Sequence, residues 1–352
     1  MHPSAYSAAA AALLCVARAQ SPPFPPSGAA AWVYDVAGGE PAMWSDDIAA
    51  FNQLAGARAH NISTVFSYGG DMEYYKADPN PFQTYFPPEN QAAALAYKRT
   101  DGVNSVVLVI DGRMDGGEDY SPDLSKLTPA QVEQWADETA DLYCSFPVVD
   151  GIQLDLEPFA PPYAAHFLVF LARLSANLRS GERNCVSPEH PAGRSITTFM
   201  FAESVTPAVW QALGPSGYLT VSGYDLSSAP AGTPDAPASY AAKLDASLAF
   251  VATSARANNG SFVVGIPAAA SAHEFETFTY ENGTVVVGAP QIEYAKAALS
   301  SLGKISGAQG YLGPALWGFA SEMAYPPHSH NVFAPGNPFV DTGEEAFLAG
   351  SL

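Results

Sequence analysis

Short runs of β-branched and aromatic residues alternate along the chain with longer stretches rich in Ala and Leu. The short runs are typical of buried strands, and the longer stretches have the length and composition of helices. The predicted strands are 31–36, 63–68, 105–111, 151–157, 195–202, 218–224, 261–267 and 314–319. The predicted helices are 43–57, 89–98, 129–143, 163–179, 207–212, 237–257 and 290–302.

Two of these helices carry additional signals. In 163–179 the apolar residues recur at spacings of three and four, as on the buried stripe of a helix: Phe167, Phe170, Leu171, Leu174 and Leu178. Thr128 precedes Pro129, and Gln131 follows Thr128 by three residues, a pattern that predicts a helix start.

The alternation of strand and helix predicts a parallel sheet, because parallel strands need a crossover between them. Eight repeats favour a closed (β/α)₈ TIM barrel of a single domain. The alternative is a doubly wound open sheet, but 36–40 (VAGGE) is a poor match to the Gly-rich fingerprint of that fold. After the seventh strand, two β-prone runs flank Asn282-Gly283, which predicts a small hairpin insertion.

The first residues are typical of a targeting segment. An apolar run over 8–17 ends at Ala17-Arg18-Ala19, which predicts a signal peptide over 1–19; the alternative is a disordered Ala-rich start. Residues 20–30 form a Pro-rich lead, and 31–352 form the predicted barrel. We therefore expect a secreted, extracellular protein.

The charge of the chain limits the classes of partner. Asp and Glu total 35 against 15 Lys and Arg, a net charge of −20. Nucleic acids and anionic membranes attract clustered basic residues, so both are disfavoured as partners. No later apolar run is long enough to predict a membrane span. We expect a monomer without a cofactor or a bound metal.

The cysteines and glycosylation sequons fit an extracellular chain. Removal of the signal peptide leaves Cys144 and Cys185, which form either a disulfide or two buried free thiols. Three N-x-[ST] sequons are compatible with a glycoprotein: Asn61, Asn259 and Asn282.

The most informative stretch is 150–158, DGIQLDLEP. Side chains alternate faces along a strand. Ile152, Leu154 and Leu156 therefore face the helices, whereas Gln153, Asp155 and Glu157 face the barrel interior. Polar groups are least costly to place at the wet C-terminal mouth, where barrel enzymes carry out their chemistry.

Asp155 and Glu157 form a pair suited to acid catalysis. Carboxylates at i and i+2 on one face are about 6–7 Å apart at the backbone, and like charges at that range raise one pKa. A protonated Glu beside an ionised Asp fits general-acid cleavage of a glycoside. The alternative is a polar strand end that a Lys or Arg elsewhere neutralises.

The same stretch resembles a known signature. It is similar to D-x-x-D-x-D-x-E on the fourth strand of glycoside hydrolase family 18, the chitinases and endo-N-acetylglucosaminidases. The resemblance implies that Glu157 is the general acid/base and that Asp155 orients the 2-acetamido group and stabilises an oxazolinium-like intermediate. Asp150 would have a supporting role at the substrate site. Gln153 stands where the family usually has Asp.

Two other strands add to the resemblance. Residues 222–225 (SGYD) resemble the family's M-x-Y-D, which implies that Tyr224 binds the acetamido carbonyl and that Asp225 lines the site. Trp317 matches the Trp that lies beneath the bound sugar in that family. The alternative for Tyr224 and for Trp317 is a buried aromatic residue of the core. The family's S-x-G-G is not reproduced on strand three, where Asp111-Gly112 stands instead.

The function implied is a secreted glycosidase that cleaves β-linked N-acetylglucosamine glycans by substrate-assisted retention. One alternative is a chitinase-like lectin that binds the glycan without turnover. Another is a barrel hydrolase of a different family, with Glu157 as acid/base and its nucleophile on another strand.

Overall fold

The computed structural model describes residues 29–33, 61–74, 82–117, 122–161, 163–226, 235–267 and 291–317, with short pieces within 45–53 and 280–289. The predicted signal peptide lies outside the described residues, as does the lead up to residue 28. The first strand begins at Ala29, so Ala29 and Ala30 belong to the barrel rather than to the lead.

Eight parallel strands form a closed barrel, as the sequence predicted. In chain order they are β1 (Ala29–Val33), β2 (Ile62–Tyr74), β4 (Ser105–Arg113), β5 (Gly151–Glu157), β6 (Ser195–Met200), β7 (Gly217–Ser222), β8 (Phe262–Pro267) and β11 (Tyr311–Trp317). Each strand pairs with the next along the chain, and β1 pairs with both β2 and β11, which closes the ring. The protein is therefore a single-domain TIM barrel.

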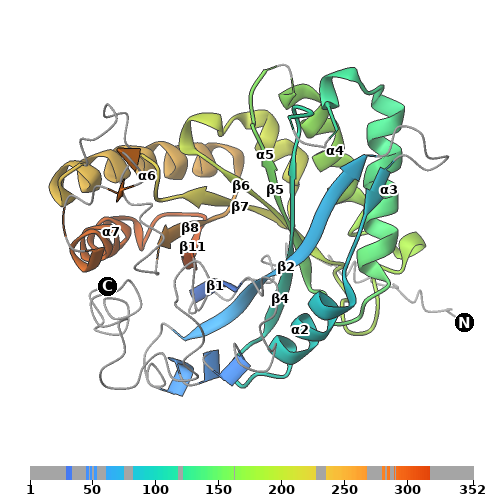
Figure 1. Cartoon of the computed structure of the whole chain (residues 1–352), viewed down its shortest axis with the longest axis horizontal. Coiled ribbons are helices and arrows are strands. Elements are labelled where there is room, and N and C mark those ends of the chain that lie inside the picture. Colours follow the sequence, from blue (N-terminus) through green and yellow to red (C-terminus); the bar gives the residue numbers. More distant parts are fainter. Residues whose placement is uncertain are drawn as a thin grey trace, which may run out of the picture.

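Helices surround the barrel (Figure 1). They are α2 (Pro88–Lys98), α3 (Pro129–Cys144), α4 (Ala164–Asn177), α5 (Pro207–Leu213), α6 (Pro237–Asn258) and α7 (Gln291–Ile305), with helical residues also at 45–46, 48–49 and 51–53. Three short 3-10 helices are η1 (Leu124–Lys126), η2 (Gly181–Arg183) and η3 (Ala202–Ser204). Thr128 and Gln131 form the predicted capping box of α3. In the described part of the chain, no helix has the length and apolarity that a membrane span requires.

Two hairpins add to the barrel. Tyr280–Glu281 (β9) and Thr284–Val285 (β10) pair in antiparallel fashion after β8, which confirms the predicted insertion after the seventh barrel strand. The second hairpin was not predicted: β2 continues to Tyr74 and pairs there with β3 (Phe82–Thr84).

The core has two layers, because the faces of each strand alternate. Inside the barrel, an aromatic and aliphatic cluster includes Trp32, Phe66, Val109 and Tyr218. Between barrel and helices lies the larger cluster, which contains Ile152, Leu154 and Leu156, as predicted for β5. The stripe predicted for 163–179 is buried there as well.

A disulfide joins Cys144, the last residue of α3, to Cys185 just after η2. The two Cα atoms are 4.8 Å apart. The disulfide expected as one of two alternatives is thus present, and it ties two segments that are 41 residues apart in the sequence.

Candidate active site

The inward face of β5 becomes more exposed toward its C-terminal end. Gln153 is fully buried in the barrel, and its Oε1 accepts a hydrogen bond from Trp32 Nε1 at 2.7 Å. Asp155 is half-buried, and Glu157, the last residue of the strand, is exposed. The strand therefore brings an exposed carboxyl group to solvent directly above a half-buried one.

A row of aspartates crosses three neighbouring strands at the level of Asp155. In the strand register, Asp155 of β5 pairs with Asp111 of β4, and Asp111 pairs with Asp71 of β2. Gly112 faces outward, because a Cβ there would meet Leu156 and Met72, so its neighbour Asp111 faces into the barrel. Glu157 of β5 pairs in the same way with Arg113 of β4.

The protonation of Asp155 reflects this crowding. Burial and, to a smaller extent, the negative charges of Asp111 and Glu157 together raise its pKa to about 8. Arg113, the residue in register with Glu157, binds Asp115 through Nε at 3.2 Å and through Nη2 at 2.8 Å.

Asp225 follows β7 at the rim of the same mouth. Its φ of 54° is in the left-handed region. Partial burial and, to a smaller extent, the charge of Glu157 together raise its pKa to about 6. Glu157 is therefore close enough to influence both Asp155 and Asp225 electrostatically.

An aromatic row stands at the mouth beside these carboxylates. The ring of Tyr224 stacks against Trp317, with centroids 6.3 Å apart, and against Phe199 at 5.8 Å. Trp317 in turn meets the edge of Trp32 at 5.7 Å. Gly265 makes room for this row, because a Cβ there would lie 3.3 Å from the Tyr224 ring. Tyr224 is buried, whereas Trp317 is partly exposed at the end of its strand.

The backbone of Tyr224 is held by Ser222. The Ser222 hydroxyl accepts the N–H of Tyr224 at 3.1 Å and donates to the carbonyl of Tyr224 at 2.7 Å. A Met at position 222, as in the motif that this segment resembles, has no hydroxyl to make either hydrogen bond. Ser222 therefore fixes the tyrosine by a local turn.

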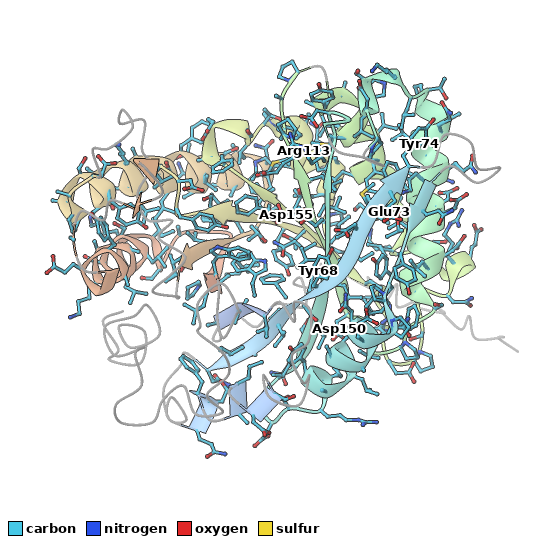
Figure 2. The ribbon with its side chains drawn as sticks, viewed as in Figure 1. Tyr68, Glu73, Tyr74, Arg113, Asp150 and Asp155 are labelled. Carbon is cyan, nitrogen blue, oxygen red and sulfur yellow. A yellow bond between two sulfur atoms is a disulfide. The ribbon has the colours of Figure 1, made fainter. Side chains whose placement is uncertain are left out.

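Asp150 lies at the other end of β5, toward the start of the strands (Figure 2). It is buried, and its Oδ2 accepts hydrogen bonds from Lys98 Nζ at 2.6 Å and from the N–H of Val106 at 2.7 Å. Its Oδ1 is 3.6 Å from Nδ1 of His190. Asp150 thus joins α2, β4 and β5. The structure does not support a substrate contact for it, because it precedes the strand whose far end forms the mouth.

The structure therefore divides the predicted site residues into two groups. The first group lies at the C-terminal mouth and consists of Asp155, Glu157, Asp225, Tyr224 and Trp317. Gln153 lies one layer deeper, where its side chain contacts Trp32 rather than solvent, and Asp150 lies at the opposite end. Within the ranges described, no group of three or more His, Cys, Asp or Glu residues is arranged to hold a metal ion.

No protein-family model and no curated protein matches this chain. Solved structures do match it over most of its length. YKL-39, solved in the presence of chitooligosaccharides (GlcNAc4), has a TM-score of 0.56 at 11% identity, covering 92% of this chain and 98% of that chain. A GH113 β-1,4-mannanase has a TM-score of 0.55 at 12% identity, covering 93% and 98%. The immunomodulatory active chitinase TsES1 from Trichuris suis has a TM-score of 0.54 at 9% identity, and the match covers 91% of this chain and 98% of that chain.

The matches also include a chitinase-like agglutinin from Robinia pseudoacacia. Identities at this level show a shared fold and nothing finer. The barrel of this protein is the one used by chitinases, by a chitinase-like agglutinin and by a mannanase.

Sequence reasoning did not select three polar residues at the mouth. Asp111 adjoins Asp155, and Tyr68 on β2 donates a hydrogen bond from its hydroxyl to Asp71. Burial raises the pKa of Tyr68, as do the charges of Asp71 and Asp111, so the phenol keeps its proton. The available signal was that Asp111 follows the apolar run 106–110 and lies two residues before the end of its strand, as Asp155 does on β5.

Proposed function

We propose that this protein is a glycoside hydrolase that cleaves β-linked N-acetylglucosamine glycans with retention of configuration. One observation carries the proposal: exposed Glu157 ends a barrel strand at the mouth, two residues beyond a carboxyl whose pKa is raised to about 8. A solvent-facing acid beside a carboxyl that keeps its proton at neutral pH is suited to proton transfer.

Each residue at the mouth then has a role in the reaction. Glu157 gives its proton to the glycosidic oxygen while the carbonyl oxygen of the substrate's acetamido group attacks C1. Asp155, once its proton has passed to Glu157, accepts the acetamido N–H and stabilises the positive oxazolinium that forms. Water then attacks C1 and loses a proton to Glu157, which restores the acid.

The aromatic row accounts for sugar binding. Trp317 is partly exposed at the end of β11, and its flat face suits the apolar face of a pyranose ring. Tyr224 stacks beside it and would donate its hydroxyl hydrogen to the acetamido carbonyl. Asp225, at the rim of the mouth, would accept hydrogen bonds from sugar hydroxyl groups.

A second candidate is a glycosidase that uses an enzyme carboxylate as nucleophile. Asp111 and Asp225 supply carboxyl groups at the mouth from strands other than β5, and a mannanase shares the fold. Such an enzyme would accept sugars without an acetamido group and would resist a thiazoline mimic of the oxazolinium. A chitinase-like lectin would bind N-acetylglucosamine oligomers and leave them intact.

We also propose that the protein is secreted as a glycoprotein. The disulfide between Cys144 and Cys185 supports this, because such bonds persist mainly in oxidising compartments. Asn259 is exposed at the end of α6, where a glycan has room, whereas Asn61 is partly buried. The sequon at Asn282 lies outside the described residues.

The test is product analysis by mass spectrometry on N-acetylglucosamine oligomers and an N-glycan. We expect Glu157→Gln to lower the rate of cleavage by about 10²–10⁴-fold, because the amide cannot donate the proton. Glu182→Gln is the matched control, since Glu182 is an exposed glutamate on η2, away from the mouth. Binding without cleavage by both proteins would establish the lectin instead. Cleavage that Glu157→Gln does not affect would refute the assignment of the acid.

A further inference from the structure

Asp155 has an acidic neighbour on the adjacent strand, but the inward residue that precedes it on its own strand is not acidic. The inward residue two positions earlier is Gln153, whose Oε1 is held by Trp32. An amide does not titrate, so Gln153 cannot exchange a proton with Asp155. On the adjacent strand, Asp111 occupies the position in register with Asp155 and faces the same interior.

The geometry brings these two carboxyl groups together. Neighbouring strands are about 4.8 Å apart, and paired residues on the same face project side by side. The carboxylate of Asp111 is anchored, because its Oδ1 accepts the N–H of Gly112 at 2.7 Å. Two carboxylates at such a distance do not both ionise readily, as in other carboxyl pairs that hold one proton.

The other charged and titratable groups around the pair come from four strands. Tyr68 and Asp71 stand next to Asp111 on β2. Arg113 on β4 is bound to Asp115, Glu157 lies beyond Asp155 on β5, and Asp225 follows β7. Most of these groups are acidic, so the local field favours retention of a proton.

We propose that Asp111 is a positioning residue that shares one proton with Asp155 and so acts with burial to keep Asp155 neutral in the free protein. The role of this shared proton in catalysis rests on the proposed glycosidase function. When an acetamido N–H approaches Asp155, the proton passes to Glu157, and the pair of Asp111 and Asp155 then faces the developing positive charge with two negative charges. One proton moves and the total charge of the site is unchanged.

The first test needs no turnover. In the full chain labelled with ¹³C at aspartate carboxyl groups, one carboxyl should titrate well above the others by NMR. In Asp111→Asn that titration should fall by about one to two pH units, because a negative neighbour is gone. Asp71→Asn is the matched control, since Asp71 lies at the same level one strand further from Asp155. An unchanged high titration in Asp111→Asn would overturn the proposal.

The second test is the pH dependence of kcat/KM, which reports groups of the free enzyme. Loss of the shared proton should determine the alkaline limb of the pH profile of kcat/KM. Asp111→Asn should move that limb to lower pH by about one to two pH units, as in the NMR titration. Asp111→Glu, which keeps a carboxyl, should keep the limb near that of the wild type. A purely structural role of Asp111 would lower the rate in both variants without moving the limb, and this outcome would also overturn the proposal.

The two tests separate the two proposals. A titration that falls in Asp111→Asn, in a protein that cleaves no glycan, would support the shared proton and refute the hydrolase. A protein that cleaves N-acetylglucosamine oligomers, with neither its titration nor its alkaline limb sensitive to Asp111→Asn, would support the hydrolase and refute the shared proton.

Discussion

At the scale of single residues, the mouth of the barrel gathers negative charge from several strands around the half-buried Asp155. Asp71, Asp111 and Asp155 share one level on three strands, and Glu157 and Asp225 lie around them. A neutral side chain at position 155 would be less costly, because a charge that loses hydration among like charges is destabilising. Clusters of carboxyl groups with strongly perturbed pKa values are typical of functional sites.

Asp155 should therefore reduce stability in a pH-dependent way. Its pKa is about 8 in the folded protein against an ordinary value of 3.8. As the pH rises from about 4 to about 8, the unfolded chain loses this proton while the folded protein retains it, which favours unfolding. We expect Asp155→Asn to raise the Tm by roughly 2–5 °C at pH 8, with little change at pH 4.

Differential scanning calorimetry at the two pH values measures this effect. Asp101→Asn is a suitable control, because Asp101 is exposed in the turn after α2. An equal change in Tm at both pH values would show that packing, rather than the proton on Asp155, explains the stabilisation.

Site residues that lie on a single strand were predictable from the sequence. The proximity of site residues on two different strands was not. The alternation along β5 is enough to place Asp155 and Glu157 on the inward face. Asp111 was not selected, because its proximity to Asp155 depends on the register between β4 and β5, which no local pattern specifies. Asp150 was assigned to the site although it precedes the strand and so lies at its opposite end.

At the scale of elements, the apolar runs predicted all eight barrel strands, because strands buried on both faces are continuously apolar. The outer part of β2 was not predicted. Its residues 69–74 (GGDMEY) are polar and Gly-rich, and they form a strand because β3 pairs with them. Pairing of this kind depends on a partner outside the segment, so propensity alone does not reveal it.

The disulfide is an element-scale constraint whose removal should be measurable. It closes a loop between residues 41 positions apart, and a loop of that length is expected to contribute about 4 kcal/mol by restricting the unfolded chain. The double variant Cys144→Ala, Cys185→Ala should therefore unfold at a lower Tm than the wild type. Reductant should lower the Tm of the wild type and leave the variant unchanged, and a reductant effect on the variant would point to another cause.

At the scale of the whole molecule, closure of the barrel through β1 and β2 removes every sheet edge in the barrel itself. Closure also directs the carboxyl ends of all eight strands to one mouth, so residues from distant segments meet there. The shared barrel of chitinases, an agglutinin and a mannanase is consistent with this, because the fold supplies the mouth and individual side chains determine the chemistry.

The net charge of −20 should make stability depend on salt over the whole surface. Like charges repel within the compact state, and at 0.1 M salt the Debye length falls to about 10 Å, which screens that repulsion. Salt also weakens the exposed ion pairs, such as Arg173 with Asp137, but these contribute little because solvent already screens them. We therefore expect the Tm at pH 8 to rise between 10 and 200 mM NaCl, by roughly 2–5 °C. The rise should vanish near pH 4.5, where the sequence has no net charge. A Tm that falls with salt at pH 8 would show instead that specific ion pairs outweigh the repulsion.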